Sequence, residues 1–157
     1  MEKMDKNIIS VANNLFFEEV ELLLNARKEV CFHVCGNSMF PFLRHGDKVV
    51  LVSLGESRVS KGSIVLAHAS FGWVLHRVLS VLGEKILLAG DANARQVESV
   101  EKRDVIGVVI RAYRNNVPVS LHSWTMRGIV FLWCWLRPFR GVLLAIWHVC
   151  KLEKTLK

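Results

Sequence analysis

Three side chains in this sequence could together carry out hydrolysis: the hydroxyl of Ser38, the imidazole of His76 and the carboxylate of Asp91. A serine hydroxyl is a weak nucleophile at its free pKa, so it needs a base within hydrogen-bond reach. The free pKa of histidine, about 6.5, suits it to accept that proton near neutrality. A carboxylate on the second ring nitrogen would fix the tautomer and the direction of the ring. These three residues are the candidate catalytic group.

The candidates lie in four short motifs that follow one another in a fixed order. The motifs are Gly36-Asn37-Ser38-Met39-Phe40-Pro41, Gly46-Asp47, His76-Arg77-Val78 and Gly90-Asp91-Ala92-Asn93. Each lies beside an apolar run typical of a β-strand, so a folded sheet could bring distant motifs together. Gly36 and Asn37 tolerate unusual backbone angles, which suits a sharp turn that presents Ser38.

Each motif alone also has a purely structural interpretation. His76 would share one strand face with Val74 and Val78, and a lone histidine on such an apolar face is more often a core residue than a catalyst. Gly-Asp-x-Asn around Asp91 is a good turn sequence, and Gly46-Asp47 is expected to be a turn as well. The hypothesis of catalysis therefore depends on the set of motifs and not on any one of them.

The apolar spacing predicts a mainly β protein with three parts: residues 1–28, 29–118 and 119–157. Within the first, apolar residues three or four apart predict an amphipathic helix over residues 5–28. The second contains short β-type runs at residues 30–34, 48–52, 63–68, 73–81, 85–88 and 105–111. Gly83-Glu84 and Ser70-Phe71-Gly72 read as hairpin turns. We expect a largely closed antiparallel β domain there.

The third part is apolar, basic and rich in tryptophan, and we expect it to be a helical tail. Its two apolar halves, residues 128–136 and 141–149, are separated by Arg137-Pro138-Phe139-Arg140, whereas a membrane-spanning helix needs about 20 apolar residues. An interfacial hairpin, a partner-bound helix pair and two helices packed on the β domain remain open. The net charge of +7 permits an anionic partner. Arginines beside tryptophans favour a membrane surface over nucleic acid.

Cysteine and histidine spacing predicts no disulfide scaffold and no metal. Cys31, Cys35, Cys134 and Cys150 contain no Cys-x-x-Cys pair, so we expect reduced and mostly buried thiols. The six histidines show neither His-x-x-x-His spacing nor a Cys/His cluster. No cofactor is expected.

As a set, the motifs resemble the signal peptidase I superfamily, which also includes the self-cleaving repressor peptidases. The resemblance rests on Ser-Met-x-Pro at Ser38, the Gly46-Asp47 pair, His-Arg-Val at His76, the Gly-Asp-x-Asn turn and Val105-Ile106-Gly107-Val108, and it covers about residues 30–110. It implies that Ser38 is the nucleophile and that His76 is the general base, as in the Ser-His branch. The implied function is a serine endopeptidase that cleaves leader or signal peptides after small residues.

The resemblance also implies the other parts of the site. An extended peptide would pair with an exposed strand edge, with Met39, Phe40 and Pro41 lining its pocket; for Met39 and Phe40 a core position is the alternative. The oxyanion hole would lie at residues 36–38. Because the family often has a Ser or Thr where this chain has Gly36, the hole would rest on backbone N–H groups such as that of Ser38, together with Asn37.

Two departures from the family leave alternatives open. The Ser-His branch commonly has a further acidic residue after its Gly-Asp-Asn motif, so Asp91, Glu98 and Asp104 all remain candidates to orient His76. Typical signal peptidases also have an N-terminal membrane anchor, where this sequence has an acidic amphipathic helix. We therefore expect a membrane-associated protein on the cytoplasmic side, with the tail touching the membrane and a leader peptide as substrate.

Two functions of other classes compete with the peptidase. One is a membrane-associated protein on the same fold that binds a peptide without cutting it. The other is a repressor-like DNA-binding protein, which is disfavoured because only some thirty residues precede the β domain, too few for a helix-turn-helix domain and a linker. Nucleic acid is therefore not an expected partner.

Overall fold

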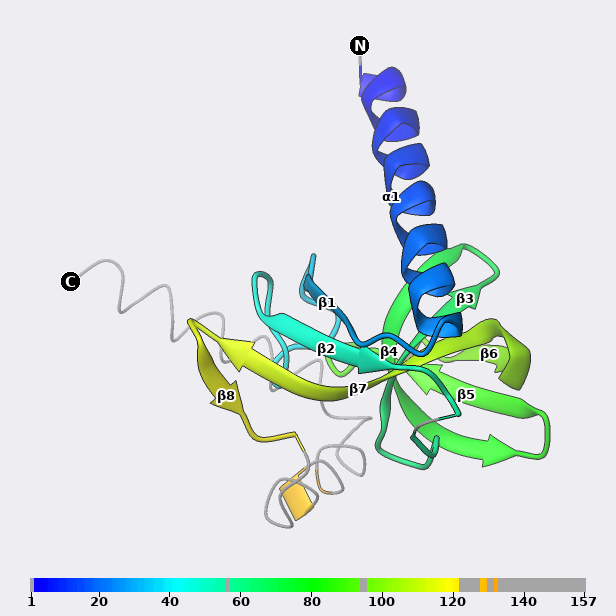
Figure 1. Ribbon diagram of the computed structural model, residues 1–157, viewed down its shortest axis with the longest axis vertical. Helices are drawn as coiled ribbons and strands as arrows, with labels where there is room; N and C mark the ends of the chain where they lie inside the picture. The colour runs from blue at the N-terminus through cyan, green and yellow to red at the C-terminus, as the bar shows by residue number, and fades with distance from the viewer. Residues whose placement is uncertain (1, 56, 94–95, 122–127, 130–131, 133–157) are drawn as a thin grey trace.

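The structure, a computed structural model, describes residues 2–55, 57–93, 96–121, 128–129 and 132. It is mainly β, with one antiparallel sheet curled into a half-barrel and one N-terminal helix (Figure 1). The elements are α1 (Glu2–Asn25), β1 (Val30–His33), β2 (Lys48–Val52), β3 (Ile64–Ala69), β4 (Gly72–Leu82), β5 (Lys85–Ala89), β6 (Glu98–Glu101), a 3-10 turn (Lys102–Asp104), β7 (Val105–Arg114) and β8 (Val117–Val119).

The strands of the sheet follow the order β1-β2-β7-β3-β4-β5-β6, and β8 pairs with β7. The predicted strands at β1 to β5 and at β7 are confirmed to within a few residues at their ends. Two strands were not predicted: β6, which carries two glutamates, and β8, which contains Pro118. Both compositions are unfavourable for a strand, and pairing with neighbours outweighs them.

Two tight hairpins fix the register around His76. Ala69 pairs with Gly72 across Ser70-Phe71, and Leu82 pairs with Lys85 across Gly83-Glu84. Gly83 adopts a positive φ of 61°, which glycine accepts without steric cost. Both predicted hairpins are confirmed.

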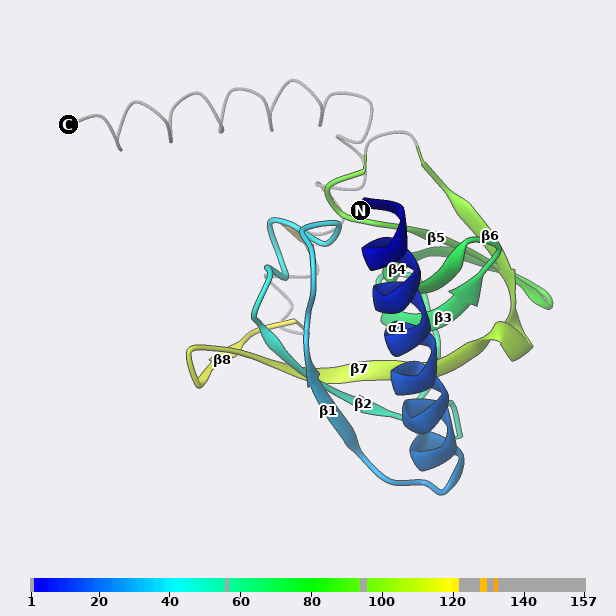
Figure 2. The same ribbon diagram turned by 90° about the horizontal axis from the view of Figure 1, so that it is seen from above.

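The second half of α1 packs on the sheet, whereas its first half extends away from it (Figure 1), so that α1 lies in front of the sheet when the molecule is seen from above (Figure 2). Val20 and Leu24 are buried in the core. A Cβ at Gly107 of β7 would lie 2.8 Å from Cδ1 of Leu24, so a side chain at this position would force the end of Leu24 to move. The helix ends at Asn25 and not at residue 28, because Arg27 turns into the left-handed region with φ 57°.

The expected burial of the cysteines is wrong for the two that the structure describes. Cys31 and Cys35 are free thiols, and both are exposed. Cys31 lies on the outward face of β1, where the neighbouring Val30 takes the buried position. Cys134 and Cys150 lie outside the described residues.

Most of the predicted tail lies outside the described residues, so its helical character remains a prediction. The exceptions are residues 119–121, 128–129 and 132: Val119 ends β8, and the side chains of Ile129 and Leu132 are exposed. Within the part of the chain that the structure describes, we find no helix with the length and apolar character needed to cross a membrane.

Candidate functional site

Ser38 lies on a loop whose two ends are held together by backbone hydrogen bonds. The N–H of Val34 donates to the carbonyl of Asp47 at 2.8 Å, and the N–H of Gly46 donates to the carbonyl of Val34 at 2.9 Å. Gly36 has a φ of 87°, so the sharp turn predicted there is confirmed. Ser38 is exposed, whereas the next residue, Met39, is only 1% exposed. The loop therefore anchors one side chain in the core and presents its neighbour to solvent.

The backbone donors of this loop differ in what they bind. The N–H of Gly36 donates to Nδ1 of His45 at 3.3 Å, so this group is already engaged and the predicted oxyanion role does not extend to it. Over residues 2–55 and the other described ranges, the N–H of Ser38 donates no hydrogen bond. The role of this N–H in an oxyanion hole remains a prediction.

The base of the loop is held by an ion pair between Asp47 and Arg114. Nη2 of Arg114 donates to Oδ2 of Asp47 at 2.7 Å, and the N–H of Arg44 donates to the same oxygen at 2.9 Å. Burial alone would raise the pKa of Asp47, but the hydrogen bonds from Arg114 and Arg44 outweigh it and lower that pKa. The hydrogen bond between Asp47 and Arg114 also raises the pKa of Arg114. The predicted Gly46-Asp47 turn is thus also an electrostatic anchor.

His76 and the Ser38 loop meet above Gly90. Arg77 pairs with Ala89, which places His76 opposite Gly90 in the antiparallel register. A Cβ on Gly90 would lie 2.6 Å from the carbonyl oxygen of Ser38 and 3.2 Å from Nε2 of His76. Those two atoms are therefore no farther apart than the sum of these distances. Only a residue without a side chain leaves room for both.

A hydrogen bond also connects the Gly90 turn to the Ser38 loop. The N–H of Ala92 donates to the carbonyl of Ser38 at 2.8 Å. Within the described ranges, no hydrogen bond joins the Ser38 hydroxyl to His76. Hydrogen bonds between catalytic groups are often long before substrate binds, so the proximity of the two residues is the relevant finding.

The other ring nitrogen of His76 is bound by a buried carboxylate. Nδ1 of His76 donates to Oε2 of Glu98 on β6, and both side chains are almost fully buried. Glu98 pairs with Leu88 of β5, so the contact crosses from β4 to β6 over the middle strand. Oε1 of Glu98 has no hydrogen-bond partner among the described residues. A carboxylate in this position fixes which nitrogen of the imidazole carries the proton.

Asp91 does not occupy the orienting position that the sequence suggested. Its carboxylate binds Arg77, which donates from Nε to Oδ1 at 2.8 Å and from Nη2 to Oδ2 at 2.7 Å. Nη1 of Arg77 donates to the carbonyl of Gly62, and the guanidinium lies 5.0 Å from the ring centroid of Phe42. Arg77 follows His76 on β4 and so faces the other side of the sheet. The predicted role of Asp91 is therefore corrected: it holds the turn beside the site.

The third acidic candidate, Asp104, lies in the turn between β6 and β7. Its carboxylate accepts the N–H of Glu101 at 3.0 Å, and the two residues form a capping box. This leaves Glu98 as the acidic residue that contacts His76. The sequence left the three candidates open, because only strand pairing places Glu98 next to a histidine 22 positions earlier.

The three residues expected to line a substrate pocket have different environments. Met39 lies in the core beside Leu24 and Leu43, so a pocket role for Met39 is wrong. Phe40 and Pro41 are half-buried, and the guanidinium of Arg44 lies 5.6 Å from the Phe40 ring. A pocket role for these two residues remains a prediction.

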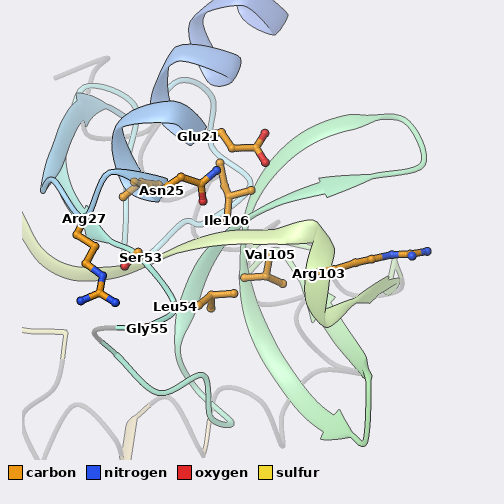
Figure 3. A pocket seen from close by; sticks show the side chains of 10 residues that line it. Glu21, Asn25, Arg27, Ser53, Leu54, Gly55, Arg103, Val105 and Ile106 are labelled. Atoms are coloured by element: carbon orange, nitrogen blue, oxygen red, sulfur yellow. The ribbon is translucent and has the colours of Figure 1, made fainter.

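A cavity of about 330 Å³ lies elsewhere, where the C-terminal end of α1 meets the segment after β2 and the start of β7 (Figure 3). Its lining includes Glu21, Arg27, Ser53, Leu54 and Ile106, and none of the predicted site residues. Over the described ranges, no group of three or more His, Cys, Asp or Glu side chains could hold a metal ion.

Sequence reasoning missed the part played by Arg77 and by the missing side chain of Gly90. A signal for the first was present, because an arginine inside the apolar run of residues 73–81 must find a partner if it is buried. The run contains one cation, and Asp91 follows the next strand. Nothing in the sequence marked Gly90 as more than a turn residue.

Neither a scan against models of known protein families nor a search of curated proteins finds a match to this chain. The resemblance to the signal peptidase I superfamily therefore depends on the sequence motifs alone.

Proposed function

We propose that this protein is a serine endopeptidase of the signal peptidase I type that uses a Ser-His mechanism. The observation that carries the proposal is the meeting of an exposed Ser38 with His76, whose second ring nitrogen binds the buried Glu98. A core histidine has no need of an exposed serine beside it, whereas a hydrolytic site requires that pair. On this proposal the half-barrel is a peptidase β domain of that superfamily.

The geometry supports a two-step acyl transfer. Nε2 of His76 takes the proton from the Ser38 hydroxyl as Oγ attacks the carbonyl carbon of the peptide. The N–H of Ser38 stabilises the resulting oxyanion. His76 then gives the proton to the leaving amine, and water activated by the same imidazole hydrolyses the ester. Glu98 holds the ring in one tautomer and stabilises the imidazolium.

The proposed substrate is a leader or signal peptide with a small residue, such as alanine, before the cleaved bond. β1 ends the strand order beside the Ser38 loop, and no other strand among the described residues pairs with its outer edge, so this edge can pair with an extended peptide. Phe40 and Pro41 are at the surface to contact its side chains. We further propose that the protein works at the cytoplasmic face of a membrane, with the arginine- and tryptophan-containing residues 124–140 against the lipid surface.

The test is mass-spectrometric detection of cleavage in a pooled library of leader and signal peptides, with lipid present. Ser38→Ala should lower cleavage at least ~10³-fold, because the covalent route is lost. Ser70→Ala changes an exposed serine in the β3–β4 hairpin and should leave cleavage unchanged. Equal cleavage by wild type and Ser38→Ala would refute the proposal. Peptide binding without cleavage in either protein would support the competing function, a non-catalytic peptide-binding protein.

A further inference from the structure

A third polar side chain, that of Asn93, lies beside His76 on the turn that follows β5. The position that a Cβ on Gly90 would take lies 3.2 Å from Nδ2 of Asn93 and also 3.2 Å from Nε2 of His76. The two nitrogen atoms are therefore no farther apart than twice that distance. The carbonyl oxygen of Ser38 lies 2.6 Å from the same position. Polar atoms from three separate segments thus gather above Gly90.

Backbone hydrogen bonds hold Asn93 in this place. The N–H of Asn93 donates to the carbonyl of Gly90 at 3.0 Å and closes the turn, while the N–H of Ala92 donates to the carbonyl of Ser38 at 2.8 Å. The side chain of Asp91, within the same turn, is buried. None of these bonds uses the side chain of Asn93, so replacing that side chain leaves the turn closed.

The side-chain amide of Asn93 has no part in the contacts that build the fold. Within the described ranges, no hydrogen bond reaches this side chain. The residue is half-buried, so solvent has access to it. A side-chain amide offers two N–H donors. Asn93 therefore presents a hydrogen-bond donor to solvent beside the nitrogen that the proposed mechanism uses.

The three atoms above Gly90 match the hydrogen-bonding groups of one water molecule. Nε2 of His76 is an acceptor, because Nδ1 carries the proton that Glu98 binds. The carbonyl oxygen of Ser38 has a second lone pair besides the one that the N–H of Ala92 uses. A water molecule donates to these two acceptors and accepts from the amide of Asn93. Three hydrogen bonds are typical of an ordered water.

The distances suit such a water. Two hydrogen bonds of about 2.9 Å each bridge atoms that are nearly 6 Å apart, which is close to the largest separation that the geometry at Gly90 allows between the two nitrogens. The second step of the proposed mechanism needs a water at Nε2 of His76, because the imidazole must deprotonate the water that attacks the ester. A water held there reacts faster than one that must diffuse in.

On the basis of the proposed peptidase function, we propose that Asn93 positions the water that hydrolyses the acyl-enzyme. Nε2 of His76 takes one proton of this water as its oxygen attacks the ester carbonyl carbon. The bond from that carbon to Oγ of Ser38 then breaks, and Oγ receives the proton from Nε2. The peptide leaves as a carboxylic acid. Asn93 donates a hydrogen bond to the water oxygen and is itself unchanged.

Partition of the acyl-enzyme between water and hydroxylamine tests this role. Hydroxylamine attacks the same ester and releases a peptide hydroxamate in place of the acid, and mass spectrometry measures the ratio of the two products. That ratio reports only on steps after the acyl-enzyme has formed. The experiment uses the full-length protein with lipid and a peptide that the wild type cleaves.

Asn93→Ala should raise the ratio of hydroxamate to acid about tenfold, because the water loses one hydrogen bond that holds it in place. The ester on Ser38 should accumulate at the same time and be detected as an increase in the intact mass of the protein. Asn93→Ser keeps a donor on a shorter side chain and should give an intermediate ratio. Asn14→Ala, which changes an exposed asparagine of α1, is the matched control and should keep the wild-type ratio. Circular dichroism checks the fold of each variant.

The possible failures of this inference and of the proposed function are distinguishable. A wild-type ratio in Asn93→Ala would overturn the role of Asn93, whether total cleavage is retained or reduced, because a purely structural effect lowers both products together. A ratio for Asn93→Ser above that of Asn93→Ala would contradict the need for a donor. If the wild type formed neither product from any peptide, the peptidase proposal itself would fail, and the role of Asn93 with it.

Discussion

Two neighbouring residues of β4 each form a buried pair with an acidic partner, and the two pairs differ in completeness. On one face, the guanidinium of Arg77 is satisfied by Asp91 and by the carbonyl of Gly62. On the other, His76 binds one oxygen of Glu98 and leaves its Nε2 beside the Ser38 loop, while the second oxygen of Glu98 has no partner among the described residues. The closed pair suits structural support, and the open pair suits chemistry.

The difference follows from where each partner lies in the sheet. Asp91 follows β5 directly, so the neighbouring strand delivers it to Arg77. Glu98 belongs to β6, one strand farther, so its contact with His76 passes over β5. The missing side chain at Gly90 makes room on the other side of the imidazole, where Nε2 of His76 approaches the carbonyl oxygen of Ser38. The closed pair keeps the Gly90 turn in place.

The largest difference between the two pairs is expected in peptide cleavage, when the open pair is broken with Glu98→Gln. The amide can present an N–H to Nδ1 of His76 and stabilise the wrong tautomer, so peptide cleavage should fall by up to ~10⁴-fold. The folded state should persist, as judged by circular dichroism. Glu101→Gln on the same strand is the control and should cleave as wild type does, because Glu101 is exposed. Equal rates for the two variants would remove Glu98 from the mechanism.

Breaking the closed pair with Asp91→Asn should act chiefly on stability. The buried guanidinium of Arg77 loses its counter-charge, which costs about 3–5 kcal/mol in the free energy of unfolding measured with urea. Arg103→Met removes the exposed pair with Glu101 and is the control, with an expected change below about 1 kcal/mol. If Asp91→Asn kept wild-type stability but lost cleavage as completely as Glu98→Gln, Asp91 and not Glu98 would be the carboxylate on which the activity of His76 depends.

The smallest effect concerns a third pair, Asp47 with the partly exposed Arg114. Because the pKa of Asp47 is lowered in the folded protein, the pair stabilises the fold above the unfolded pKa, near 3.9, and this contribution is lost as the pH falls below that value. At pH 7, Asp47→Asn should lower the free energy of unfolding by about 1–3 kcal/mol. The difference from wild type should shrink between about pH 4 and pH 2. A difference that stayed constant over that range would show that the charge of Asp47 is not responsible.

The sequence by itself determined the local elements and the two central candidates. The apolar spacing was enough for α1, for most strands and for the hairpin at Gly83-Glu84, because these depend on neighbours a few residues apart. The turn at Gly36 was predicted for the same reason. Ser38 and His76 could be named because few side-chain types perform this chemistry.

Only the tertiary structure decided which acidic residue contacts His76, whether Met39 belongs to the core, and that position 90 must lack a side chain. Glu98 could not be chosen over Asp91 or Asp104 from the sequence, because the choice depends on strand order and on which face each residue takes. Met39 was ambiguous because a loop residue becomes core only when the loop folds back on the sheet. Gly90 is the clearest case, since a glycine shows in sequence that it can turn, whereas the neighbours it makes room for are fixed by long-range packing.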